Sequence, residues 1–164
     1  MSNINNCTLR PVSENDLVTV MEFYRSQIGT PGCTWNQYYP NEEILKEDFI
    51  SGTLYGLYTE DELIGAISVD SENYLDKLPC WQFKSNVKEI ARVVISSKYQ
   101  KQGFGSILLQ MLFRLLKQQG TDTIHLLVSP DNERAIKLYS QFGFINRGQY
   151  YLYEHNYFAM ETMI

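Results

Sequence analysis

EIARVVISSKYQKQGFGSILL, residues 89–109, decides the fold. The stretch opens on a mostly apolar run with β-branched side chains, which is typical of a buried central strand. Two glycines then mark a turn, and apolar residues at helical spacing follow them. The pattern predicts a strand over 88–95, a helix over 103–119 and a second buried strand over 124–128. Because strand–helix–strand units cross over in the right-handed sense, the two strands are predicted to be parallel.

The helix predicted over 103–119 has one apolar stripe, which is expected to face a sheet. The members of this stripe are Leu108, Met111, Leu112, Leu115 and Leu116. Gly120 suits the position just after the last turn of the helix.

Periodicity and turn residues predict the remaining elements. Before the central unit they are a strand at 8–10, a helix with Leu17, Val20, Met21 and Tyr24 on one face, a loop over 29–40, a helix over 42–50 capped by Asn41, and a hairpin of 53–59 with 62–70 that turns at Glu60 and Asp61. After it they are a helix over 132–142 and two strands that turn near 154–156. This order predicts an α/β (α+β) fold, with a mixed, mostly antiparallel central sheet of about seven strands flanked by about four helices. Residues 1–164 are expected to form a single domain.

Composition and charge favour a globular intracellular protein. Of the 164 residues, 44% are hydrophobic and 20% are charged, and the net charge is −5, whereas a nucleic-acid-binding protein is more often basic. No secretory signal is visible at the start, and no apolar run approaches the ~18 residues of a membrane span. A cytoplasmic location is therefore predicted, with no nucleic-acid or membrane partner. The 3 cysteines are widely spaced and there are 2 histidines, so no metal site is expected.

The turn over 100–106 has two features of an anion site. A helix N-terminus carries unpaired N–H groups and about half a positive charge, and glycine lets the backbone approach a phosphate closely. The stretch lacks the GxxxxGK[ST] motif of a P-loop, and Leu108 stands where the dinucleotide motif needs a third glycine. The glycines alone leave two interpretations open, a tight strand-to-helix turn and an anion site.

Two motifs follow one another in the second half of the chain. The first, Q/R-x-x-G-x-G/A after a strand, is matched by Gln100, Gly103 and Gly105. The second is N-x-x-A followed by L-Y-x-x-x-G-F, and its matching residues are Asn132, Ala135, Leu138, Tyr139, Gly143 and Phe144. In this order the two motifs resemble those of the GNAT acetyltransferase superfamily, and the resemblance covers about residues 88–146.

This resemblance implies acetyl-CoA as the cosubstrate, with no metal. Backbone N–H groups of the glycine turn would hold the coenzyme pyrophosphate. The pantetheine arm would lie beside residues 93–95, where that strand parts from the strand over 124–128. The residues implied at the coenzyme are Val93, Val94, Ile95, Gln100, Lys101, Gln102, Gly103, Phe104, Gly105, Ser106, Asn132 and Tyr139.

Attack of an amine on a thioester needs a neutral amine, a stabilised oxyanion and a proton for the leaving thiolate. The resemblance implies the backbone N–H of Val94 as the donor to the thioester carbonyl and Tyr139 as the proton donor to sulfur. A phenol of pKa ~10 donates to a thiolate whose conjugate acid has a pKa of ~8.5 with a modest uphill step. Glu89 matches the general base of some family members. The alternatives are a tyrosine that packs between helix and sheet, and a surface carboxylate at a strand end.

The acceptor side is predicted from aromatic residues. Trp35, Tyr38 and Tyr39 lie on the loop that often shapes the acceptor pocket in this family, and Trp81 lies in an irregular stretch further on. Aromatic walls suit a cationic amine, although loop aromatics also cover the edge of a core.

Two polar residues stand inside apolar strands. Arg92 needs a partner if it is buried, and it either faces the cleft or pairs with an acid. His125 is expected to be a satisfied core or rim residue rather than a catalytic one.

The predicted function is an acetyl-CoA-dependent N-acetyltransferase that moves an acetyl group to a primary amine of a small molecule or peptide by direct attack. The alternative is a non-catalytic acyl-CoA-binding sensor or interaction module. A monomer or homodimer is expected.

Overall fold

The fold is built on one β-sheet. The computed structural model describes residues 6–70 and 74–164, and its seven strands follow the order β1-β2-β3-β4-β5-β7-β6. They are β1 (Cys7–Pro11), β2 (Leu54–Thr59), β3 (Glu62–Asp70), β4 (Val87–Ile95), β5 (Thr123–Val128), β6 (Ile145–Leu152) and β7 (His155–Met163). Neighbouring strands are antiparallel except β4 and β5, which are parallel. The predicted mixed, mostly antiparallel sheet is confirmed.

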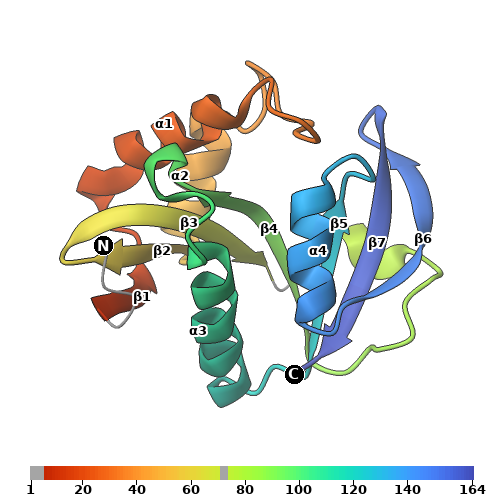
Figure 1. Cartoon of the computed structure of the whole chain (residues 1–164). Coiled ribbons are helices and arrows are strands. Elements are labelled where there is room, and N and C mark those ends of the chain that lie inside the picture. The colour runs from red at the N-terminus through yellow and green to blue at the C-terminus, as the bar shows by residue number, and fades with distance from the viewer. Residues whose placement is uncertain (1–5, 71–73) are drawn as a thin grey trace.

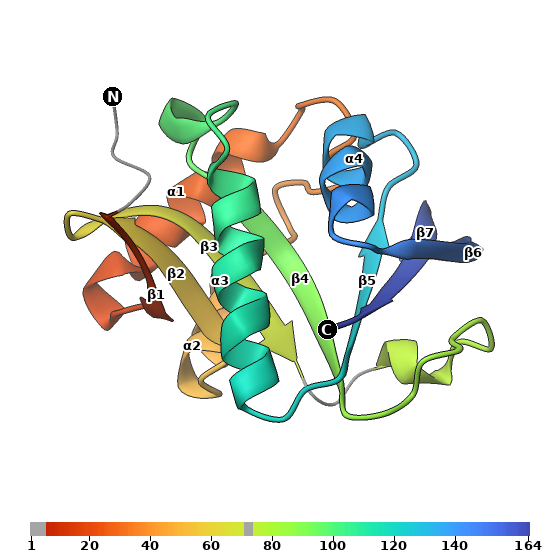
Figure 2. The ribbon, with the colours of Figure 1, turned by 60° about the horizontal axis from the view of Figure 1, so that its bottom comes forward.

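Helices cover both faces of this sheet (Figure 1, Figure 2). In the described residues the four α-helices are α1 (Leu17–Gln27), α2 (Glu42–Ile50), α3 (Phe104–Gln118) and α4 (Glu133–Gln141). α3 and α4 share one buried cluster with the sheet, and α1 and α2 share another. Because successive residues of a strand point to opposite faces, Leu63 joins the α1–α2 cluster and Ile64 joins the α3–α4 cluster. None of the helices in these ranges is long and apolar enough to cross a membrane.

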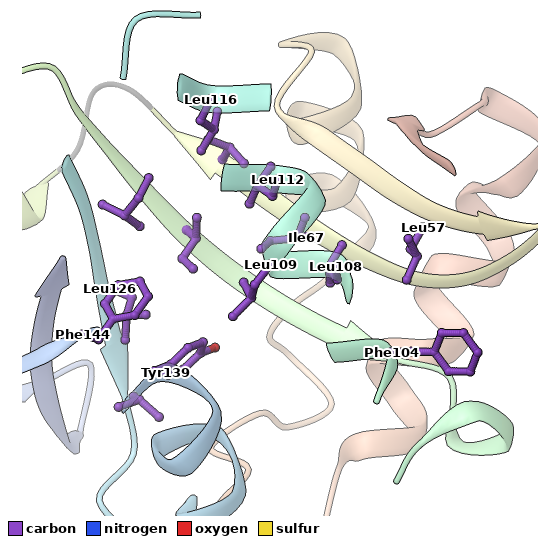
Figure 3. Packing of buried hydrophobic residues seen from close by; sticks show 14 of the residues in the cluster. Leu57, Ile67, Phe104, Leu108, Leu109, Leu112, Leu116, Leu126, Tyr139 and Phe144 are labelled. Atoms are coloured by element: carbon purple, nitrogen blue, oxygen red, sulfur yellow. The ribbon is translucent and has the colours of Figure 1, made fainter. Parts of the chain in front are cut away.

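The stripe that α3 buries differs from the predicted one. Leu108, Leu112 and Leu116 are buried as expected, and Leu109 is fully buried as well. Met111 and Leu115, which were predicted in the stripe, are only partly buried. Figure 3 shows Leu108, Leu109 and Leu112 projecting from α3 over the strands. Because α3 lies across the middle of a broad sheet, its apolar face spans the adjacent positions 108 and 109.

β4 and β5 part soon after they begin. Their parallel pairing covers only Val87–Glu89 against Thr123–His125, although β4 continues to Ile95 and β5 to Val128. A register shift with β3 follows on β4, at a bulge that contains Arg92. Bulges bend a strand and increase its local twist, so β4 turns away from β5 beyond this point.

Candidate active site

The turn at the start of α3 presents unbonded backbone amides. Gly103 has φ +86° and precedes the helix, and no side chain caps this end. Among the hydrogen bonds found in the described ranges, none is donated by a backbone N–H of residues 102–106. Lys101 and Gln102 are exposed beside it. The open N–H groups and the positive end of the helix dipole together make this turn suitable for an anion.

The two glycines of the turn have different structural roles. A Cβ on Gly103 would meet nothing within 4 Å, so Gly103 is required by its left-handed backbone alone. A Cβ on Gly105 would lie 3.2 Å from Leu138 Cδ2 of α4. Gly105 therefore allows α3 to approach α4 closely, and only part of the glycine pattern concerns the turn itself.

Gln100 ties the turn to its surroundings. Its Nε2 donates to the Ile95 carbonyl at 2.9 Å and to Gln27 Oε1 at 3.2 Å. Its Oε1 lies 3.4 Å from Arg134 Nη1 of α4. This side chain thereby connects the end of β4 with α1 and α4.

Asn132 and the loop before α2 meet at the N-terminus of α4. Asn132 Oδ1 accepts from the Ala135 N–H at 3.2 Å and so caps α4. A Cβ built on Gly32 would lie 2.4 Å from Asn132 Cα, so the backbone of this loop touches α4. The Asn132 carbonyl oxygen is therefore used by the helix, and its amide NH₂ is the group left for a ligand.

Tyr139 lies inside the α3–α4 cluster with 7% of its surface exposed. Its ring packs edge-to-face on Phe144 at a centroid distance of 5.5 Å. In Figure 3 the Tyr139 hydroxyl is directed toward β4. Burial raises the pKa of Tyr139 above its ordinary value, so the phenol is neutral and its O–H is a donor.

The register of β3 with β4 fixes the direction of the β4 amides. The Ser96 N–H donates to the Ile64 carbonyl at 2.8 Å. In an antiparallel strand, backbone hydrogen bonds to one neighbouring strand recur at every second residue. Val94, two residues before Ser96 and opposite Ala66, therefore also directs its backbone N–H and C=O toward β3. By the same alternation we expect the N–H of Val93, which follows Arg92 at the bulge, to face the opposite edge, on the side of β5.

Glu89 occupies the point where the strands part. It is opposite His125 in the last paired position of β4 with β5, and it is opposite Asp70 of β3. Its side chain is partly exposed. The predicted base is thus placed at the opening between the two strands.

The predicted acceptor residues fall into different environments. Trp35 is partly buried and packs edge-to-face on Tyr24 at 5.3 Å, whereas Tyr38 is 74% exposed. The Tyr39 hydroxyl accepts a hydrogen bond from Arg92 Nη1 at 3.0 Å. Trp81 does not join this group.

Trp81 is a core residue, which corrects the prediction that it lines the substrate pocket. Only 3% of it is exposed, it stacks on His125 at 3.8 Å, and its indole N–H donates to the Leu75 carbonyl. The stacked pair covers the face of the sheet that α1 and α2 leave open. His125 is buried in the core, as expected, and its Nε2 lies 2.9 Å from the Phe83 carbonyl oxygen and 3.1 Å from Glu161 Oε2.

Asp48 is the partner that the sequence did not reveal for Arg92. Arg92 Nε donates to Asp48 Oδ2 at 2.9 Å, and Nη2 donates to Oδ1 at 3.0 Å. Burial lowers the pKa of Arg92, but Tyr39 and Asp48 together raise it above the ordinary value. The alternative in which Arg92 pairs with an acid is therefore the one observed, and an arginine inside an apolar strand was the only signal for it.

Comparison with known proteins places this geometry in a family. The model of the acetyltransferase (GNAT) family matches residues 20–144. A GNAT acetyltransferase from Streptococcus agalactiae 2603 has a similar structure, with a TM-score of 0.84 and 16% identity over 96% of this chain and 95% of that one. AAC(6')-Ib, in complex with ribostamycin and coenzyme A, has a TM-score of 0.73 and 23% identity over 96% and 93% of the two chains. A Salmonella typhimurium protein with acetyl-CoA bound has a TM-score of 0.73 and 16% identity over 96% of this chain and 94% of that one. These likenesses show a shared fold.

Proposed function

Because the chain belongs to the GNAT acetyltransferase family, we propose that it transfers an acetyl group from acetyl-CoA to a primary amine of a small molecule or peptide. The observation that carries this proposal is the set of unbonded amides at residues 102–106, beside two strands that part. Coenzyme bound to two structural neighbours supports it.

We place the coenzyme pyrophosphate on the amides of 102–106, with Lys101 beside it. The pantetheine arm then lies between β4 and β5, along residues 93–95, where unpaired backbone groups meet its amides. Asn132 donates through its side-chain NH₂, since its oxygen caps α4. Gln100 acts by holding the turn to Ile95.

The pairing of β3 with β4 favours a different oxyanion donor from the one that the resemblance implied. Val94, the implied donor, is paired with Ala66 of β3, whereas the alternation of the strand directs the N–H of the preceding residue, Val93, toward the β5 side. We therefore assign the donor to the thioester carbonyl to Val93. A backbone donor aimed at a developing oxyanion typically contributes about 10²- to 10³-fold in rate.

In the proposed reaction Glu89 takes a proton from the amine, directly or through water. The amine nitrogen forms a bond to the thioester carbon, and the carbon–sulfur bond then breaks. Tyr139 gives its proton to the thiolate. Burial raises the pKa of Tyr139 and also that of a thiol in the same apolar surroundings, so the transfer stays moderately uphill. Replacing Glu89 with Gln is expected to lower kcat with a primary amine by about 10²-fold or more, and an unchanged rate would exclude Glu89 as the base.

Thiol release from acetyl-CoA in the presence of a panel of amines tests the activity. Turnover that depends on the amine supports the transferase. Thermal stabilisation by coenzyme with no turnover for any amine favours the alternative, a non-catalytic acyl-CoA-binding module. The cytoplasmic location, the single domain and the monomer or homodimer stay predictions.

A further inference from the structure

Arg92 has a backbone conformation that its residue type disfavours. Its φ is +50°, and among the described residues other than glycine it alone has a positive φ within a strand. The left-handed conformation is unfavourable for an L-residue with a side chain. Something in the surrounding structure must therefore hold it.

The guanidinium group of Arg92 is held by a carboxylate through two of its nitrogens. Asp48 of α2 accepts two hydrogen bonds, from Nε and Nη2, at 2.9 and 3.0 Å. Ser68 Oγ donates to the same carboxylate at 2.8 Å and fixes it to β3. The two charged side chains are only 15% and 13% exposed. A bidentate pair of this kind is geometrically specific and weakly screened.

The clamped residue lies between two fixed registers. Ser68 pairs with Ala91 on one side of the bulge and Ala66 with Val94 on the other, which leaves one extra residue on β4. The bulge therefore persists, and the conformation at Arg92 decides where the next N–H, that of Val93, points. The third nitrogen of the Arg92 side chain, Nη1, donates to the Tyr39 hydroxyl, on the loop between α1 and α2, at 3.0 Å.

We infer that Arg92 is a positioning residue: Asp48 clamps its side chain, the backbone stays left-handed at the bulge, and the Val93 N–H is thereby aimed at the thioester carbonyl. This inference rests on the proposed function. It assigns the specific role of Arg92 to its backbone, so a residue that adopts the same backbone without strain should replace it.

Glycine and alanine at position 92 separate a backbone role from a side-chain role. Both remove the guanidinium, but only glycine adopts positive φ without cost. Either change alone leaves Asp48 buried without its partner, which destabilises a protein strongly. Both are therefore made together with Asp48→Asn, and folding is checked by circular dichroism. Arg10→Ala, which breaks the exposed pair with Asp61, controls for the loss of an arginine–aspartate pair.

The readouts are kcat, both KM values and the infrared stretch of carbonyl-labelled acetyl-CoA bound to the enzyme. In the Asp48→Asn background, Arg92→Ala should lower kcat by about 10²-fold or more and abolish the downward shift of the thioester stretch. Arg92→Gly should keep the shift and most of kcat, and Arg10→Ala should match the wild type. Equal loss in the alanine and glycine variants overturns the inference, and a loss confined to the amine KM assigns Arg92 to the acceptor instead. Absence of turnover in the wild type contradicts the proposed function, whereas the infrared comparison still tests the backbone role.

Discussion

At the scale of single residues, the proposed chemistry depends on a tyrosine hydroxyl inside an apolar cluster. Tyr139 is neutral because burial raises its pKa, and its ring is held by Phe144. Its ring can therefore stay in place when the hydroxyl is removed. Removing this hydroxyl should therefore affect the rate of the reaction and leave coenzyme binding almost unchanged.

Tyr139→Phe should lower kcat by about 10²-fold or more, the usual contribution of a general acid, while acetyl-CoA affinity stays within a few-fold. Steady-state kinetics and calorimetric titration measure the two quantities. Tyr58→Phe is the control, because it removes another buried hydroxyl, which donates to Asp16 at 2.8 Å on the far side of the sheet. An unchanged rate in Tyr139→Phe means that another group protonates the thiolate.

Local contacts could be predicted from the sequence, whereas contacts between distant segments could not. Asn41 was predicted as a cap because the signal is local, and its Oδ1 accepts from Ile44 N at 3.0 Å. The partner of Arg92 is 44 positions away on a helix of one face, and no local pattern marks such a pair. Trp81 sits in a stretch without periodicity, so nothing in the sequence distinguished a core ring from a pocket wall.

At the scale of elements, the loop between α1 and α2 makes a close backbone contact at the N-terminus of α4. Gly29 and Gly32 both have left-handed backbones, with φ +85° and +78°. A Cβ on Gly29 would meet nothing within 4 Å, whereas on Gly32 it would meet the backbone of Asn132 at 2.4 Å. The loop that carries Trp35 and Tyr39 is thus seated on α4 at Gly32.

Gly32→Ala should displace this loop, and Gly29→Ala should only strain it. Both changes cost roughly 1–2 kcal/mol for the left-handed backbone, and Gly32→Ala should cost about 1–3 kcal/mol more through the clash. Urea unfolding measures the difference. The KM for the amine should rise in Gly32→Ala alone. If Gly32→Ala and Gly29→Ala have equal effects on stability and on the KM for the amine, the contact of Gly32 with Asn132 does not hold the loop.

Helices and strands were predictable where a regular spacing of apolar residues continues over many positions. The apolar spacing marked α3 to within a residue or two at each end. The bulge in β4 was not predictable, because an apolar run carries no sign of one extra residue. That residue shifts the register of β4 against β3, and it is the reason why we propose Val93 rather than Val94 as the donor.

At the scale of the whole molecule, one buried carboxylate joins the segment before β4 to the sheet. Glu161 is fully buried and accepts from the Gln82 N–H at 2.9 Å and from Arg147 Nε at 2.8 Å. Burial raises its pKa, but the N–H of Gln82, Arg147, the N–H of Phe83 and His125 outweigh it, so the pKa is lowered. A carboxyl with a lowered folded-state pKa stabilises above its unfolded pKa of about 4.3 and loses that contribution as the pH falls.

Glu161→Gln should therefore be less stable than the wild type at pH 7, and the difference should shrink as the pH falls below about 4. Urea unfolding across this range gives the free energies. Glu154→Gln, at the exposed turn between β6 and β7, should show no such trend. A difference that is constant from neutral to acidic pH would show that the ionised form of Glu161 is not the stabilising one.

At the scale of the whole molecule, the open end of α3 follows the end of β4, which has parted from β5 by then, and the proposed function depends on a diphosphate bound at that end of α3. An amide NMR titration tests this most directly, with coenzyme A in one series and S-acetylpantetheine, which lacks the diphosphate, in the other. If the diphosphate binds there, the amide signals of residues 102–106 should shift with coenzyme A and hardly move with S-acetylpantetheine, while those of residues 93–95 should respond to both. Coenzyme binding that leaves the amides of 102–106 unmoved would contradict diphosphate binding at that end of α3.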